Sequence, residues 1–126
     1  MNAVEEVVRH HRFIEGWLRG TAGAHELNAF LAAHTPDFTW YDPDGALRTL
    51  PELGPAMEEA HGAAPDLTLE IREPRVLLDR DGLLVATYEE HHRTPGVSSA
   101  RRALAVLVPG TLRWRHLHET WIVQPG

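Results

Sequence analysis

The sequence predicts an α+β domain in which helices cover one face of a curved, antiparallel sheet. Apolar residues recur at helical spacing in the first half of the chain. From Pro65 onward, long stretches alternate polar and apolar residues, which is typical of strands with one buried face. Short turn motifs separate these stretches, so the strands are expected to pair as a meander. Residues 1–126 have the length of a single domain, and we expect one.

The first half is expected to hold three helices and one strand. Residues 4–20 form the first helix, which ends at Gly20, and residues 25–34 form a shorter second helix. An aromatic strand over 37–45 follows and ends in the turn motif Asp-Pro-Asp-Gly. The third helix covers 50–62, with a proline near its start and a glycine as its last residue.

Four strands are expected in the second half. The first covers 66–79, and Pro74 within it predicts a bulge or a sheet edge, because proline cannot donate a hydrogen bond to a neighbouring strand. An Arg-Asp-Gly turn leads into the second strand, 83–92. The third covers 100–108, and after a Pro-Gly-Thr turn the fourth covers 112–123.

The composition excludes several kinds of chemistry. All 12 basic residues are arginine, so a lysine Schiff base is impossible, and the absence of cysteine removes thiol nucleophiles and thiolate metal sites. Serine occurs only at Ser98 and Ser99, in an expected turn, and no glycine-rich phosphate loop is present. Any catalysis must therefore use carboxylates, histidines or the two tyrosines, and we expect no cofactor.

Charge and hydropathy exclude two classes of partner. The net charge is −6 and no basic stripe is present, so nucleic-acid binding is not expected. No apolar run approaches the roughly 20 residues that span a bilayer, and the N-terminus lacks a signal-peptide pattern. We therefore expect a cytoplasmic protein that does not bind membranes.

Three stretches carry a resemblance to a known superfamily: VVRHHRFIEGWLRG, DFTWYDPDGALRTLPELGPAMEEAHG and WRHLHETWIV. In this order they resemble the nuclear transport factor 2-like, or SnoaL-like, proteins, and in particular their small bacterial stand-alone domains. The resemblance implies a cone-shaped, curved mixed sheet covered by three N-terminal helices. It also implies a pocket for a small apolar molecule and a homodimer formed through the outer sheet face. The activity stays open, because this fold hosts isomerases, cyclases, dehydratases, hydrolases and non-catalytic association domains.

The resemblance assigns a general base. Ketosteroid isomerases of this superfamily keep a proton-abstracting aspartate in a comparable turn, which corresponds to Asp42 here. Phe38 and Trp40 would line the mouth of the cone, and desolvation there would raise the pKa of the Asp42 carboxyl. The tyrosine oxyanion donor of the isomerases has Phe13 as its nearest equivalent, so ketosteroid-type isomerisation is not expected.

The last expected strand has two faces, and only one can line the pocket. The resemblance assigns Leu117, Glu119 and Trp121 to the pocket and places His116 and His118 on the outer face. Hydrophobicity alone favours the opposite set. The His-x-His spacing would also supply two metal ligands, but a closed site needs three or four, so metal binding is the weaker alternative.

Three further groups are candidate site residues. Glu119 is either an acid or base opposite Asp42 or the ion-pair partner of Arg102 or another strand arginine. His11 and Glu15 lie one helical turn apart within the apolar arc of the first helix, so Glu15 either satisfies a buried histidine or raises its pKa. Glu89 and His91 alternate onto one strand face and could reach the mouth of the cone. Glu15, Glu89, His91 and Arg102 are therefore further pocket candidates.

The leading hypothesis is a small-molecule-binding cone-fold protein. If it is an enzyme, Asp42 would act as general base without a cofactor and His11 would assist it. The first alternative is a non-catalytic, dimeric binding or association module, and the second is a histidine-liganded metal protein.

Overall fold

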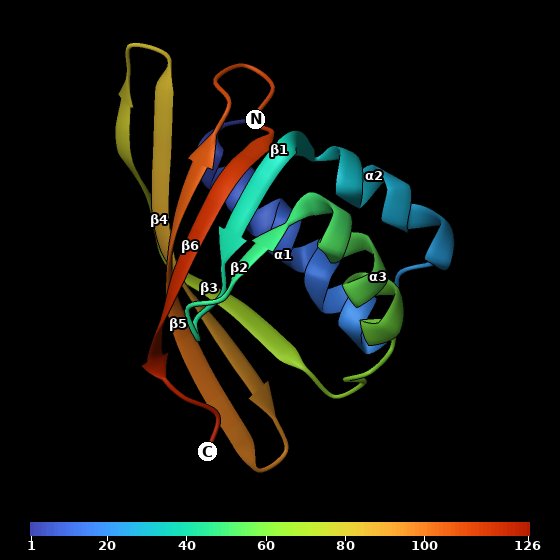
Figure 1. Ribbon diagram of the computed structural model, residues 1–126. Helices are drawn as coiled ribbons and strands as arrows, with labels where there is room; N and C mark the ends of the chain where they lie inside the picture. Colours follow the sequence, from blue (N-terminus) through green and yellow to red (C-terminus); the bar gives the residue numbers. More distant parts are fainter.

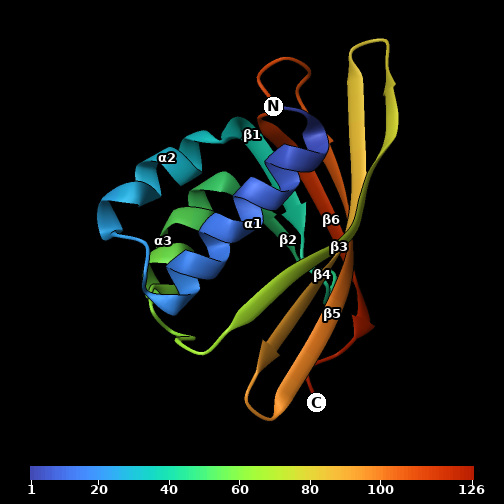
Figure 2. The same cartoon turned by 180° about the vertical axis from the view of Figure 1, so that it is seen from behind.

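Three α-helices lie on one side of a six-stranded sheet in the computed structural model, which describes all residues 1–126 (Figures 1 and 2). The elements in chain order are α1 (Ala3–Arg19), the 3₁₀ turn η1 (Ala24–Glu26), α2 (Leu27–Ala32), β1 (His34–Tyr41), β2 (Leu47–Thr49), α3 (Leu50–Ala60), β3 (Thr68–Arg80), β4 (Leu83–Thr94), β5 (Val97–Leu107) and β6 (Trp114–Val123). The sheet order is β2-β1-β6-β5-β4-β3, and only β1 and β6 are parallel. The predicted α+β class and the curved mixed sheet are confirmed.

The first helix has clear signals at both ends. The Asn2 side chain accepts a hydrogen bond from the Glu5 backbone N–H, and the Glu5 carboxylate accepts one from the Asn2 N–H. This reciprocal capping satisfies two free donors at the N-terminus. Gly20 ends the helix at φ 85°, a left-handed conformation that glycine adopts without strain. The expected second helix is shorter than predicted, because His34 already pairs with Trp114 as the start of β1.

The hairpin turn after β3 and the position of Pro74 agree with the sequence predictions. Asp81 and Gly82 connect β3 and β4 with φ 53° and 77°, as a two-residue hairpin turn requires. β3 lies at the edge of the sheet, and its register with β4 shifts between Arg72 and Arg75, on either side of Pro74. The proline thus marks both an edge and a bulge. The far end of this hairpin extends beyond the helices in Figure 1.

A bulge in β6 decides which side chains of that strand face the helices. Leu107 pairs with Trp114, but Val106 pairs with His116, so Arg115 is an extra residue in β6. Trp114 therefore points to the same side as Leu117 and Glu119, although strict alternation would separate them. A strictly alternating strand would place Trp114 on the same face as His116, and the extra residue prevents this.

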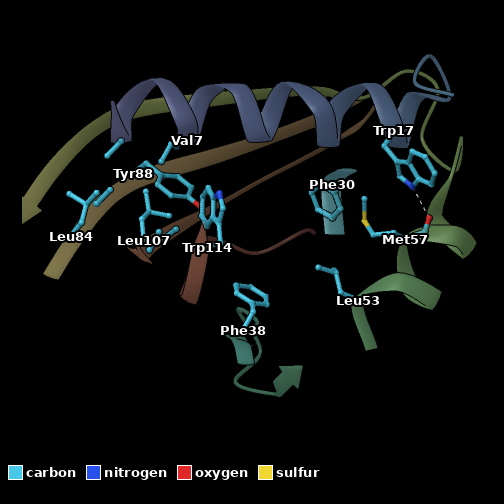
Figure 3. Packing of buried hydrophobic residues seen from close by; sticks show 14 of the residues in the cluster. Val7, Trp17, Phe30, Phe38, Leu53, Met57, Leu84, Tyr88, Leu107 and Trp114 are labelled. Carbon is cyan, nitrogen blue, oxygen red and sulfur yellow. Dashed lines mark hydrogen bonds between the residues drawn. The ribbon is translucent and has the colours of Figure 1, made fainter. Parts of the chain in front are cut away.

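The core lies between α1 and the inner face of the sheet (Figure 3). Trp17 and Trp114 are almost fully buried, and the Trp17 indole N–H donates to the Met57 carbonyl oxygen at 2.6 Å, which ties α1 to α3. Alanines occupy the inner face of β4 and β5 at positions 86, 103 and 105. Their small side chains accommodate the large aromatic residues opposite. No helix is both long and apolar enough to cross a bilayer.

Candidate functional site

A cavity of about 190 Å³ lies between the helices and the inner sheet face. Eight apolar side chains line it: Ile14, Leu18, Phe30, Phe38, Trp40, Leu53, Met57 and Leu117. Seven polar or charged ones complete the lining: His10, His11, His34, Glu90, His92, Arg101 and Glu119. A mostly apolar cavity with a few convergent polar groups is typical of a small-molecule site.

Glu119 is the cavity carboxylate whose pKa is raised. It lies on β6 and is 5% exposed. Its Oε1 accepts a hydrogen bond from the Trp40 indole N–H at 2.7 Å and lies 3.5 Å from Nη1 of Arg101, whereas its Oε2 has no protein partner. Burial and then the like charge of Glu90 raise the pKa of Glu119 to about 7, and Arg101 and Trp40 oppose this rise. Glu119 can therefore give or take a proton near neutral pH.

Arg101 is held beside Glu119 by two contacts. Besides the ion pair, its guanidinium carbon lies 4.9 Å from the centroid of the Trp121 ring, which is a cation–π contact. The register of β4 and β5 places Arg101 directly opposite Glu90. No hydrogen bond joins the guanidinium to the protein, and its Nε is buried without a partner.

A carboxylate between two imidazoles forms the second polar group of the cavity. Glu90 Oε1 lies 2.9 Å from His11 Nε2, and Glu90 Oε2 contacts His92 Nε2. His11 Nδ1 lies 2.8 Å from the Val7 carbonyl oxygen, which can only accept, so Nδ1 carries a proton. Burial lowers the pKa of His11, but the Glu90 carboxylate and then the Val7 carbonyl oxygen raise it, and the net result is a raised pKa. Burial alone would raise the pKa of Glu90, but His11 and then His92 hold it well below its usual value.

His10 and His34 contribute uncharged rings to the cavity. His10 is stacked between Phe30 and Trp114 at centroid distances of 4.9 and 4.3 Å. His34 Nδ1 donates to the Phe30 carbonyl oxygen at 3.0 Å. Burial lowers the pKa of both rings, that of His10 most strongly, so both are neutral at physiological pH. The buried Glu6 carboxylate, on the same helix as His10, accepts a hydrogen bond from the Trp114 indole N–H at 2.8 Å.

Five of the predicted site residues meet in this cavity: Phe38, Trp40, Leu117, Glu119 and His11. Leu117 and Glu119 face inward, as the resemblance implies and against the hydrophobicity of the strand. His11 is paired with Glu90, and not with Glu15 as expected, because the Glu15 carboxylate accepts from the Leu69 backbone N–H at 2.7 Å.

Asp42 lies outside the cavity, in the turn between β1 and β2. Its Oδ1 accepts from the backbone N–H groups of Asp44 and Ala46, each at 3.0 Å, and its Oδ2 lies 3.3 Å from Arg48 Nε. Burial would raise the pKa of Asp42, but the Ala46 N–H, the Arg48 side chain and the Asp44 N–H lower it overall. The predicted raised pKa is wrong, because the turn supplies hydrogen bonds to the ionised carboxylate.

Three predicted pocket residues lie on the outer sheet face. Glu89 Oε1 lies 2.9 Å from His91 Nε2, and Glu89 Oε2 lies 3.4 Å from Arg102 Nη2. The strand expected to offer Glu89 and His91 turns Glu90 and His92 inward instead. Arg102 correspondingly pairs with Glu89, and Arg101 takes the expected place beside Glu119.

The remaining candidates lie at the rim and on the outer face. Trp121 is not part of the cavity lining, and its indole N–H donates to Asp44 Oδ1 at 2.8 Å. His116 and His118 lie on the outer face beside Tyr41, and His116 Nδ1 lies 2.8 Å from the Thr39 hydroxyl. No cluster of three or more potential ligands surrounds them or forms elsewhere.

Sequence reasoning missed Glu90, His92, Arg101, His10 and His34 as cavity residues. A signal for the first two exists, because alternation from the aromatic Tyr88 places Glu90 and His92 on its face. Arg101 has no such signal, since Leu104 and Val106 make the opposite face of its strand look like the buried one.

The architecture defines a cone-fold α+β protein with a partly enclosed, mainly apolar cavity. Among solved structures, an NTF-2-like protein of unknown function from Pseudomonas aeruginosa is 30% identical, with a TM-score of 0.87 over 93% of this chain and 95% of its own. The chain belongs to this nuclear transport factor 2-like family, as the sequence resemblance predicts.

Two more distant structures share the fold alone. A putative ketosteroid isomerase from Shewanella frigidimarina is 20% identical, with a TM-score of 0.65 over 94% of this chain and 95% of its own. The CaMKII hub homology domain of Chlamydomonas reinhardtii is 18% identical, with a TM-score of 0.65 over 95% of this chain and 98% of its own. No protein-family model and no curated protein matches the chain.

Proposed function

We propose that this protein is a cofactor-independent enzyme that transfers a proton to or from a small, largely apolar organic molecule, with Glu119 as the acid–base group. The observation that carries the proposal is a buried carboxyl with a pKa of about 7 on the wall of an apolar cavity. General acid–base catalysis is most efficient when the catalytic pKa lies near the working pH.

The neighbours of Glu119 have distinct roles in this proposal. Trp40 holds Oε1 in place, which leaves Oε2 to exchange the proton with the substrate. Arg101 stabilises the ionised form of Glu119 and can donate to charge that develops on the substrate. The nearby Glu90 carboxylate adds to the effect of burial in raising the pKa of Glu119, and its partner His11 offsets part of this rise.

A neutral probe with an acidic C–H tests whether Glu119 is a working base. In 5-nitrobenzisoxazole, removal of the C3 proton breaks the ring N–O bond and releases a coloured cyanonitrophenolate. We expect the protein to accelerate this elimination, with a rate that rises through a pKa near 7 as Glu119 ionises. Glu119→Gln should lower the rate at least ~100-fold.

Two further variants make the assay decisive. Glu89→Gln changes a carboxylate on the outer face and should retain the full rate. Asp42→Asn separates the two candidate bases, since the sequence resemblance assigns the base to Asp42 and the cavity assigns it to Glu119. A rate that is lost in Asp42→Asn and retained in Glu119→Gln would overturn the proposal.

We also infer that two copies pair through the outer sheet face. Two apolar side chains on this face are exposed by more than a third: Leu78 (36%) and Leu83 (42%). Burying them would favour association, because removing apolar surface from water is the main driving force for it. Sedimentation velocity should give the mass of two chains for the wild type, and Leu83→Arg should shift the protein toward monomer. A monomeric wild type at micromolar concentration would contradict the inference.

A further inference from the structure

The Arg101 guanidinium is a strong donor group that the protein leaves largely unused. It carries five N–H donors but makes no hydrogen bond to another residue, and its contacts are the ion pair with Glu119 and the ring of Trp121. Guanidinium groups match carboxylates because two parallel N–H donors fit two oxygens. Arg101 lines the cavity, so its donors point to a ligand that brings acceptor oxygens.

The charges around Glu119 define the sign of that ligand. The titratable groups that line the cavity with it are His10 and His11 on α1, His34 on β1, Glu90 and His92 on β4, and Arg101 on β5. The helices α2 and α3 contribute only apolar side chains to this lining. His11 and Glu90 form an ion pair and cancel, and burial keeps His10 and His34 neutral. When Glu119 is protonated, the charge of Arg101 is therefore not balanced by a cavity carboxylate.

We propose that the ligand is a small organic monocarboxylate whose carboxylate binds between Arg101 and protonated Glu119 and whose apolar body fills the cavity. This inference rests on the proposed function and names its substrate class. A cavity of about 190 Å³ suits a body about the size of one aromatic ring, since an apolar cavity of ~150 Å³ binds benzene.

Binding of such an anion is linked to the protonation of Glu119. An ionised Glu119 would repel the ligand carboxylate, whereas a protonated one donates a hydrogen bond to it. The complex therefore takes up a proton at pH values above the pKa of free Glu119, which is about 7. Glu119 then starts the reaction in its protonated form and acts as the acid toward the bound substrate.

Calorimetric titration with phenylacetate and its isosteric amide, phenylacetamide, tests the inference. We expect phenylacetate to bind at least ~10-fold more tightly than the amide at pH 6, and its Kd to rise ~10-fold between pH 6 and pH 8, since one proton is bound. The amide should show no such pH dependence. Arg101→Gln should weaken phenylacetate binding at least ~10-fold, whereas Arg102→Gln, the neighbouring arginine on the outer face, should leave it unchanged.

The Glu119→Gln variant tests whether the proton taken up on binding lies on Glu119. Its Kd for phenylacetate should be the same at pH 6 and pH 8. Equal affinity of the wild type for phenylacetate and phenylacetamide, or no binding of either, would overturn the inference. This comparison needs only the wild type, so it holds even if Arg101→Gln fails to fold.

The result for the ligand class can be told apart from the result for the proposed function. Glu119-dependent elimination of the neutral probe without a preference for phenylacetate would remove only the ligand class. Phenylacetate binding through Arg101 without that elimination would remove only the catalytic role.

Discussion

Glu90→Ala is expected to lower the free energy of unfolding by about 3–5 kcal/mol, the usual cost of removing one partner of a buried ion pair. The Glu90 carboxylate is 6% exposed and contacts both His11 and His92. Its loss leaves the protonated His11 ring buried without a counter-charge, and the ring must then give up its proton. Denaturant unfolding at pH 6, followed by tryptophan fluorescence, measures the difference.

Glu89→Ala is the matched control for Glu90→Ala, because the two glutamates are adjacent in β4 and face opposite sides of the sheet. Its ion pairs with His91 and Arg102 lie on the outer face, so the expected change is below about 1 kcal/mol. Similar losses for the two variants would show that the His11–Glu90–His92 group is not buried as described.

The substitution Glu90→Gln tests the pKa of His11 directly. The folded-state pKa of His11 is raised above 6.5, so its charged form stabilises the fold below that pH, and this contribution is lost as the pH rises through the folded-state pKa. NMR titration should find the pKa of His11 above 6.5 in the wild type and below it in a folded Glu90→Gln variant, where desolvation remains and the carboxylate charge does not.

Local sequence signals predicted the elements of this fold well because each depends on a few neighbouring residues. Gly20 ends α1 through its positive φ, Asp81 with Gly82 forms the β3–β4 hairpin, and Pro74 marks the bulged edge strand. The resemblance then supplied the curvature of the sheet and the inward face of β6. None of these features required knowledge of strand register.

The candidate site could be predicted only in part, because register and bulges determine which side chains meet. The extra residue Arg115 brings Trp114 and Glu119 to one face. The pairing of β5 with β4 and β6 selects Arg101 over Arg102, although Leu104 and Val106 make the face of Arg102 look like the buried one. Asp42 was misassigned for a related reason. Its residue type fits a base, but the backbone N–H groups two and four residues further along the turn already donate to its Oδ1.

The pH dependence of stability gives an independent measure of Glu119, without a substrate. A carboxyl whose pKa rises from 4.5 to about 7 on folding binds more protons in the folded state than in the unfolded state between these values. Glu119 therefore does not lower the free energy of unfolding below pH 4.5. The free energy of unfolding falls as the pH rises toward the folded-state pKa, and it levels off above that pKa. A difference of about 2.5 between the pKa values corresponds to on the order of 3 kcal/mol.

Glu119→Gln should remove this loss, because the amide keeps an oxygen for the Trp40 N–H but does not ionise. Between pH 4.5 and pH 8 the wild type should therefore lose about 3 kcal/mol more stability than the variant, measured by denaturant unfolding at a series of pH values. Glu59→Gln, at an exposed position on α3, should follow the wild-type curve. Parallel curves for wild type and Glu119→Gln would mean that Glu119 ionises with an ordinary pKa. Such a carboxyl would be almost fully ionised at neutral pH, so it could not serve as the proposed acid.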